Sequence, residues 1–229
     1  MRILKSALIA LLAVTALGAA AHDRDTRRAV TMWWVIFNNP DACTANPGGT
    51  EQCGGVDVFG EAFLDSIASG VPNPALISPN VDAGLAVIHG TGAITNRKGR
   101  VRMVASIYRS SEPLDMTGAQ TIDPMGLGTA YTDTGAEVHL VVRDHGKVVR
   151  SGRIDQITNF LEPYCSDPIL LADGGENICQ DVQFAVFAPG ETGKDSMIRF
   201  ADQGMESGAF AYLVRQGDVM QAVVETRVH

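Results

Sequence analysis

The side chains most able to do chemistry gather in one short stretch past the middle of the chain. Five titratable residues stand almost side by side there: Glu137, His139, Arg143, Asp144 and His145. Histidine acts as an acid, a base or a metal ligand near neutral pH, because its unperturbed pKa is close to neutrality. The stretch is therefore the first candidate for a polar site, in which His139 has His145 or His89 as its partner.

The element that must hold these side chains is predicted to be a β-hairpin over residues 136–153. Hydrophobic and polar residues alternate with the period of two that is typical of a half-buried strand. The alternation places Glu137, His139 and Arg143 on one face of this strand. A turn is predicted at Asp144–Lys147, where a glycine can adopt a positive φ, and a return strand follows it.

Two interpretations of this face remain open. In the first, His139 and His145 or His89 form a metal site or an acid–base site with Glu137. In the second, the face is solvated, and Glu137 forms a weak surface ion pair with Arg143. The sequence contains no His-x-His or His-Glu-x-x-His ligand pair.

His22 is a separate candidate metal ligand. If an N-terminal leader is removed after Ala21, His22 becomes the first residue and can bind Cu(II) through its α-amine and its imidazole. Such a histidine brace needs a second histidine. The available ones are the remaining four: His89, His139, His145 and His229.

Residues 1–21 have the pattern of a secretory signal peptide. Arg2 and Lys5 form a charged start, Ala7–Leu17 is apolar, and small residues follow at a predicted cleavage site. The chain is therefore predicted to be periplasmic or secreted, with residues 22–29 as a mobile tail. No later stretch is apolar enough to cross a membrane as a helix, so no transmembrane span is expected in the mature chain.

The charge of the chain excludes one class of partner. The formal net charge is −8. Removal of residues 1–21 takes away Arg2 and Lys5, so that the loss of two positive charges changes −8 to −10. An acidic balance favours solubility and argues against general nucleic-acid binding. An unknown ligand or protein is the expected partner.

Four cysteines in an exported chain predict disulfide bonds. Cys43 and Cys53 enclose one short loop, and Cys165 and Cys179 enclose another. Four cysteines allow three pairings, of which the two local ones are expected here. Residues 30–229 are accordingly predicted to form a single disulfide-stapled β-domain.

Short alternating segments and turns predict an all-β fold, either an antiparallel sandwich or a barrel, with long loops. Helical spacing of hydrophobic residues occurs once, at 60–69. The strands are predicted at 30–37, 85–95, 100–108, 181–187, 209–214 and 219–228, in addition to the central hairpin. The pairs 85–95/100–108 and 209–214/219–228 are expected to be hairpins.

A basic spot surrounds the turn between two of these strands. It consists of Arg97, Lys98, Arg100 and Arg102. One interpretation is a contact with an anionic glycan or a lipid head group. The other is protection of an exposed edge strand by charge, which prevents pairing with other chains.

Three segments carry a resemblance to known proteins: Trp33–Pro40 with the two cysteines after it, the run from Glu137 to Gly146, and the run from Cys179 to Phe184. Together they resemble a family of exported bacterial proteins of uncharacterised function, and this resemblance implies no activity. Residues 136–149 also resemble the chordin-type (CHRD) domain, an extracellular β-domain with a His-x-His before a glycine-rich turn. Glu137 stands where that motif has its first histidine.

The function that follows from these observations is an exported β-domain that acts as a binding or interaction module for an unknown ligand. The alternative is a metal-binding protein or enzyme that uses the histidines named above, with copper as its candidate cofactor. No Gly-x-Ser-x-Gly or Walker A motif is present. Whether the chain is an enzyme is left open by its sequence.

Overall fold

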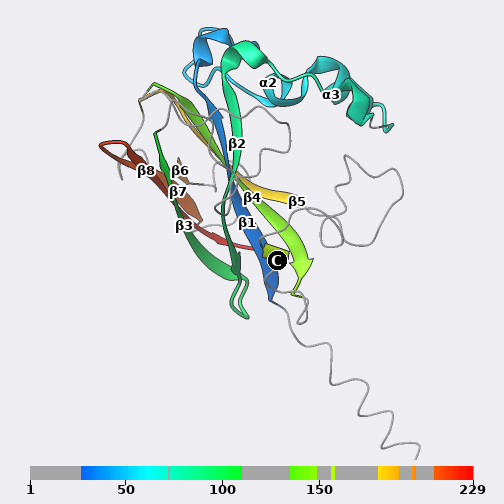
Figure 1. Cartoon of the computed structure of the whole chain (residues 1–229). Helices are drawn as coiled ribbons and strands as arrows, with labels where there is room; N and C mark the ends of the chain where they lie inside the picture. Colours follow the sequence, from blue (N-terminus) through cyan, green and yellow to red (C-terminus); the bar gives the residue numbers. More distant parts are fainter. Residues whose placement is uncertain are drawn as a thin grey trace, which may run out of the picture.

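Two four-stranded antiparallel sheets pack face to face in the computed structural model (Figure 1), which describes residues 27–71, 73–109, 135–148, 156–157, 180–190, 198–199 and 209–228. The first sheet has the order β2-β1-β4-β5, and its strands are β1 (Arg28–Phe37), β2 (Leu85–Ile94), β4 (Glu137–Lys147) and β5 (Gln180–Phe187). The second sheet has the order β3-β8-β7-β6, and its strands are β3 (Arg100–Tyr108), β6 (Ile198–Arg199), β7 (Phe210–Gln216) and β8 (Val219–Arg227). The predicted all-β fold is confirmed, as a sandwich.

The main core fills the space between the two sheets. Strand β3 shows how the sequence builds it, because its residues alternate strictly between exposed and buried positions. Its buried side chains meet alternate residues of the opposite sheet, such as Trp34, Ile36 and Leu140. Period-two alternation therefore predicted the inner face of this strand correctly.

Strand β1 is buried on both faces, which explains why it is apolar at nearly every position. Its outer face is covered by residues 38–84, which connect β1 to β2 and include α2 (Gly55–Phe59) and α3 (Glu61–Ala68) (Figure 1). This connection also contains the 3-10 turns η1 (Pro40–Ala42), η2 (Pro74–Leu76) and η3 (Val81–Ala83). A second apolar cluster forms beneath it, with Trp33, Val35 and Phe37 against Cys43 and Val58.

The predicted hairpin at 136–153 is wrong in its turn and in its pairing. Strand β4 continues through Lys147, which pairs with Arg28, and its neighbours in the sheet are β1 and β5. The glycine of the predicted turn, Gly146, does have a positive φ of 82°. It lies at an irregularity in the pairing with β1, so the turn-like sequence bends the strand without reversing it.

The predicted hairpin of 85–95 with 100–108 is also wrong, although both strands exist. The described pairings place β2 next to β1 and β3 next to β8, so the tight turn between them carries the chain from one sheet to the other. Alternation and turn residues are the same in both arrangements, and the sequence therefore could not distinguish them. The closing hairpin of β7 and β8 is confirmed, with Gly217 at a φ of 59° in its turn.

The remaining differences are small. The predicted helix at 60–69 is confirmed as α3, whereas α2 is an additional helix that the sequence did not predict. Strand β1 begins at Arg28, within the predicted tail 22–29, and β6 lies in a stretch that was expected to be loop. In the part of the chain that is described, no helix is both long and apolar enough to span a bilayer. The predicted signal peptide lies outside the described residues.

Candidate functional site

The predicted site residues lie on the outer face of the first sheet, and this face is buried. Glu137 is 0% exposed and His139 is 2% exposed, because residues 38–84 cover them. His145 and His89 are 3% and 4% exposed. The solvated-face interpretation is therefore wrong for these residues. A strand pattern shows which side chains share a face, but not which other segment folds over that face.

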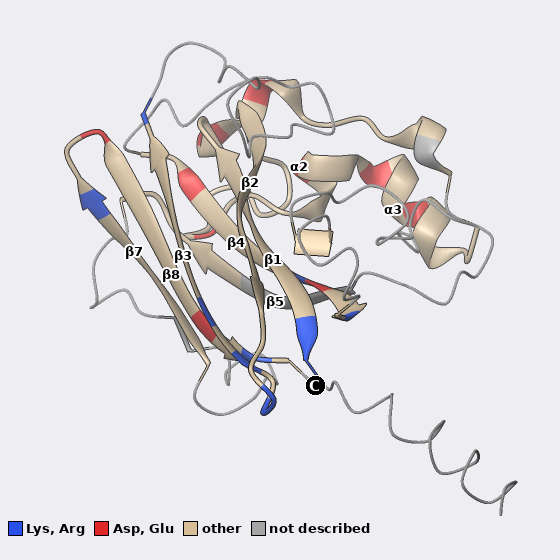
Figure 2. Ribbon diagram, turned by 60° about the horizontal axis from the view of Figure 1, so that its bottom comes forward, with Lys and Arg blue, Asp and Glu red and all other residues tan. Residues whose placement is uncertain are grey.

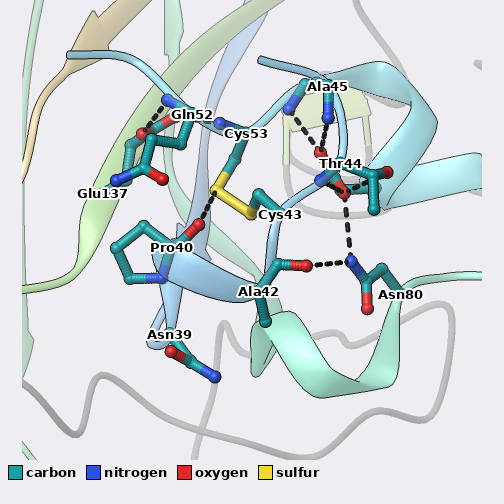
Figure 3. The surroundings of a disulfide bond; sticks show 12 residues. Asn39, Pro40, Ala42, Cys43, Thr44, Ala45, Gln52, Cys53, Asn80 and Glu137 are labelled. Carbon is teal, nitrogen blue, oxygen red and sulfur yellow. Dashed lines mark hydrogen bonds between the residues drawn. A yellow bond between two sulfur atoms is a disulfide. The ribbon is translucent and has the colours of Figure 1, made fainter. Parts of the chain in front are cut away.

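Glu137 holds the disulfide loop against the sheet. Its two carboxylate oxygens accept the backbone N–H of Gln52 at 2.6 Å and that of Cys53 at 3.0 Å (Figure 3). Oε1 also lies 2.7 Å from Nε2 of His139, whose ring packs edge-on against Phe37. Strand β4 thus provides a buried carboxylate with three hydrogen-bond partners, two from the disulfide loop and one from β4 itself.

The pKa of Glu137 is lowered from its usual 4.5. Burial acts most strongly and would raise the pKa, because it penalises the charged form. The hydrogen bonds from His139, Gln52 and Cys53 together outweigh that effect and favour the carboxylate. Glu137 is therefore ionised at neutral pH and functions as an anchor for the loop.

Asp57 is a second buried anchor, which was not predicted from the sequence. Its carboxylate accepts the backbone N–H groups of Thr44, Ala45 and Gly54 at 2.7, 3.3 and 3.0 Å, and the side-chain amide of Asn80 at 3.1 Å. Burial would raise its pKa, but these hydrogen bonds lower it below the usual 3.8. The signal in the sequence was an acid three residues after Gly54, the spacing of a helix N-cap interaction.

The Cys43–Cys53 disulfide joins the segment that binds Asp57 to the segment that binds Glu137. Its predicted pairing is confirmed, and neither cysteine is exposed. Cys43 is followed by residues bound to Asp57, and Cys53 is bound to Glu137. The loop is thus held covalently at its ends and by a carboxylate on each side. The predicted Cys165–Cys179 bond lies outside the described residues.

A second polar chain crosses the same face at the other end of β1. The indole Nε1 of Trp33 donates to the hydroxyl oxygen of Thr31 at 2.9 Å, and this oxygen lies 2.7 Å from Nε2 of His145. The amide of Gln156 donates to the backbone oxygens of His145 and Lys147 at 3.0 and 2.8 Å. These contacts connect β1 and β4 to the segment 156–157, which lies over them.

His89 is placed next to this chain but makes a different kind of contact. Its ring meets Trp33 edge-on, with centroids 5.0 Å apart. Both ring nitrogens are buried and have no hydrogen bond of good geometry to any described residue. Burial lowers the pKa of His89 from 6.5, and the nearby backbone of Ile157 offsets this only in part. His89 is therefore neutral at physiological pH.

The structure separates the predicted partners. His139 and His145 are six residues apart on one strand, a distance of about 20 Å at the usual rise. His139 binds Glu137, whereas His145 binds Thr31. The same spacing excludes the predicted ion pair between Glu137 and Arg143.

No three metal-ligating side chains come together in the described residues. This statement covers histidine, cysteine, aspartate and glutamate. Of the proposed ligands, His22 and His229 lie outside the described part of the chain. The histidine brace therefore stays a prediction.

Surface charge is uneven over the sandwich, with acidic segments around α2 and α3 and a group of basic segments at the start of β1 and β3 (Figure 2). Residues 38–84, here called the acidic cover, contain six carboxylates and no lysine, arginine or histidine. All of these carboxylates except that of Asp57 are exposed. In the sequence, strand β2 lies between the acidic cover and the turn that leads to β3. Because β2 has ten residues and is about 33 Å long, it separates the acidic cover from this turn.

The opposite end is basic. Its exposed cations, here called the basic end, are Arg97, Lys98, Arg100, Arg102 and Arg227. Lys98, Arg100 and Arg102 form no ion pair within the part of the chain that is described. Glu225 is the acid on β8 that stands opposite Arg102 in the strand pairing. Among the described residues of this end, exposed cations therefore outnumber exposed carboxylates.

Comparison with known proteins found no match among family models, curated proteins or solved structures. The resemblances to an exported bacterial family and to the chordin-type domain therefore stay predictions.

Proposed function

We propose that this protein is an exported binding module, periplasmic or secreted, that uses its basic end to bind an anionic partner. One observation carries the proposal: exposed cations gather at one end of a chain whose formal net charge is −8. In an acidic protein, cations scattered at random would be offset by nearby carboxylates. Here the carboxylates of the acidic cover are far away at the other end (Figure 2).

The backbone beneath the basic end supports this proposal. Asn96 Oδ1 accepts the backbone N–H groups of Lys98 and Arg100 at 2.8 and 3.1 Å, which fixes the turn that carries the cations. Arg100 and Arg227 stand directly opposite each other in the pairing of β3 and β8. Like charges at such positions destabilise a sheet, which is understandable if both of them serve binding.

A cation-exchange experiment tests the proposal. The exported protein, purified after native processing, is applied at pH 7.5 and low salt to a sulfonate matrix. We expect retention in spite of the negative net charge, because a localised patch binds independently of charges beyond the Debye length of about 10 Å at 0.1 M salt. Arg100→Gln should elute at lower salt.

Arg109→Gln provides the matched control for this experiment. Arg109 lies at the other end of β3, where it pairs with Asp218 at 2.9 Å. The substitution removes one positive charge directly after the far end of β3, and the elution of this variant should resemble that of the wild type. A wild-type protein that flows through the matrix would contradict the proposed function.

Metal binding is the second candidate function, and one observation favours it. His89 has two buried ring nitrogens without a hydrogen-bond partner among the described residues. Elemental analysis of the exported protein tests this function. Stoichiometric copper or zinc that disappears in His89→Ala would support it, and a metal-free wild type would exclude it.

A further inference from the structure

The basic end is also the end at which the chain enters the sandwich. Strand β1 begins there, and the backbone N–H of Thr95 donates to the carbonyl oxygen of Arg28 at 2.9 Å. The last described residue, Val228, donates to the carbonyl oxygen of Gly99 at 3.0 Å. Both ends of the described chain are thus attached beside the turn that carries the cations (Figure 1).

This placement has a consequence for orientation. The apolar stretch Ala7–Leu17 precedes Arg28 by only about ten residues in the sequence. This leader is predicted to be removed on export, so in the mature protein charge alone sets the orientation at an anionic bilayer, with the basic end toward the lipids. The acidic cover is then about one strand length, or 33 Å, farther away. Anionic lipids attract the near end, and they repel the far end only weakly because of screening.

We propose that the basic end binds the anionic phospholipid surface of a membrane, with the acidic cover directed away from it. This inference rests on the proposed function and names its partner. Lys98, Arg100 and Arg102 are exposed side chains with no ion pair within the described chain; the first lies in a turn of fixed shape and the other two at the start of β3. Each cation near an anionic membrane strengthens binding about fivefold.

Vesicle binding tests this inference. The exported protein is sedimented with vesicles of phosphatidylcholine alone and with vesicles that contain one third phosphatidylglycerol. The measured quantity is the ratio of the two partition coefficients, because binding that does not depend on lipid charge is the same in both. We expect a ratio well above one in low salt and a decrease of this ratio in high salt.

The variants locate the surface. Arg100→Gln should lower the ratio about fivefold, and the triple variant Lys98→Gln, Arg100→Gln, Arg102→Gln should lower it about 100-fold. Arg109→Gln, at the other end of β3, should leave it unchanged. All three positions of the triple variant are exposed, so circular dichroism should show an unchanged fold.

Two results would overturn the inference. One is equal binding of the wild type to the two kinds of vesicle. The other is a triple variant that keeps the wild-type ratio. If the protein binds the sulfonate matrix or soluble dextran sulfate but not anionic vesicles, the partner is a soluble polyanion. The membrane inference then fails, whereas the proposed function stands.

Discussion

At the scale of the residue, Glu137 is the side chain whose role differs most from the sequence-based expectation. It was a candidate ligand in a polar site, and it is a buried anchor with three hydrogen-bond partners. Its neighbour His139 is the same kind of residue, since its ring lies between Glu137 and Phe37. Chemical type and spacing placed Glu137 and His139 on one face of a strand, but they did not show that a distant segment buries both side chains.

Glu137→Gln should destabilise the protein by about 2–4 kcal/mol. Glutamine keeps the size of the side chain but loses the charge, and its NH2 group faces a backbone N–H that then lacks an acceptor, while the amide oxygen still accepts from the other. Urea unfolding of the oxidised protein measures the loss. Glu225→Gln, on an exposed position of β8, is the control and should change stability by less than 0.5 kcal/mol. A loss below 0.5 kcal/mol in Glu137→Gln would show that the anchor contributes little.

His89 predicts a pH dependence of stability. Its pKa is lowered from 6.5 in the folded protein, so the unfolded chain binds a proton at a higher pH than the folded chain does. The stability is therefore complete above about pH 6.5 and decreases as the pH falls below that value toward the folded pKa. Glu137 and Asp57 have pKa values below 4.5 and 3.8, so they remain ionised between pH 7.5 and 5.5.

The measurement is the free energy of unfolding of wild type and His89→Leu between pH 7.5 and 5.5. The wild type should lose more stability over this range than the variant. If the free energy of unfolding depends on pH in the same way for both proteins, His89 has the same pKa in the folded and in the unfolded chain, which would contradict the prediction.

At the scale of the element, the strands were predictable and their partners were not. The sequence predicted β1, β3, β7 and β8 well, because alternation or continuous hydrophobicity follows directly from burial of one or both faces. It failed where a tight turn connects two strands of different sheets. The turn between β2 and β3 contains Asn96 and Gly99, residues that also suit a hairpin. Only the packing of complete sheets decides which connection forms.

Gly99→Ala tests how closely this connection is packed. A Cβ at Gly99, where φ is 77°, would approach the carbonyl oxygen of Val228 to 2.2 Å. Gly48 is the matched control, since its φ is 76° but a Cβ there would meet no atom within 4 Å. Gly48→Ala should cost about 1–2 kcal/mol for the backbone conformation alone.

The expected result in thermal unfolding is a larger decrease of Tm for Gly99→Ala than for Gly48→Ala. The difference between them measures the close approach to Val228. Equal decreases would show that the end of β8 moves away from the turn at no cost.

At the scale of the whole molecule, the protein consists of a sandwich and a cover. The stability of the cover depends on the sandwich more than the stability of the sandwich depends on the cover. The main core joins both sheets, and it contains Leu140 at 0% exposure. The acidic cover contributes to the second cluster, on the outer face of one sheet. Its attachment relies on the disulfide and on the carboxylates of Asp57 and Glu137. The sequence did not predict this layer, because the contacts that hold it join residues as much as 85 positions apart.

This unequal dependence predicts different effects for substitutions in the two layers. Leu140→Ala should destabilise the whole sandwich by about 2–5 kcal/mol, because it leaves a cavity between the sheets. Asp57→Asn should loosen the cover first, since Thr44, Ala45 and Gly54 lose the charge that their N–H groups bind.

Amide hydrogen exchange followed by mass spectrometry measures both effects by segment. In Asp57→Asn, protection should fall in residues 43–60 while β3, β7 and β8 keep theirs, whereas Leu140→Ala should lower the protection of all strands together. Equal loss of protection in cover and sandwich for Asp57→Asn would show that the two layers open as one unit.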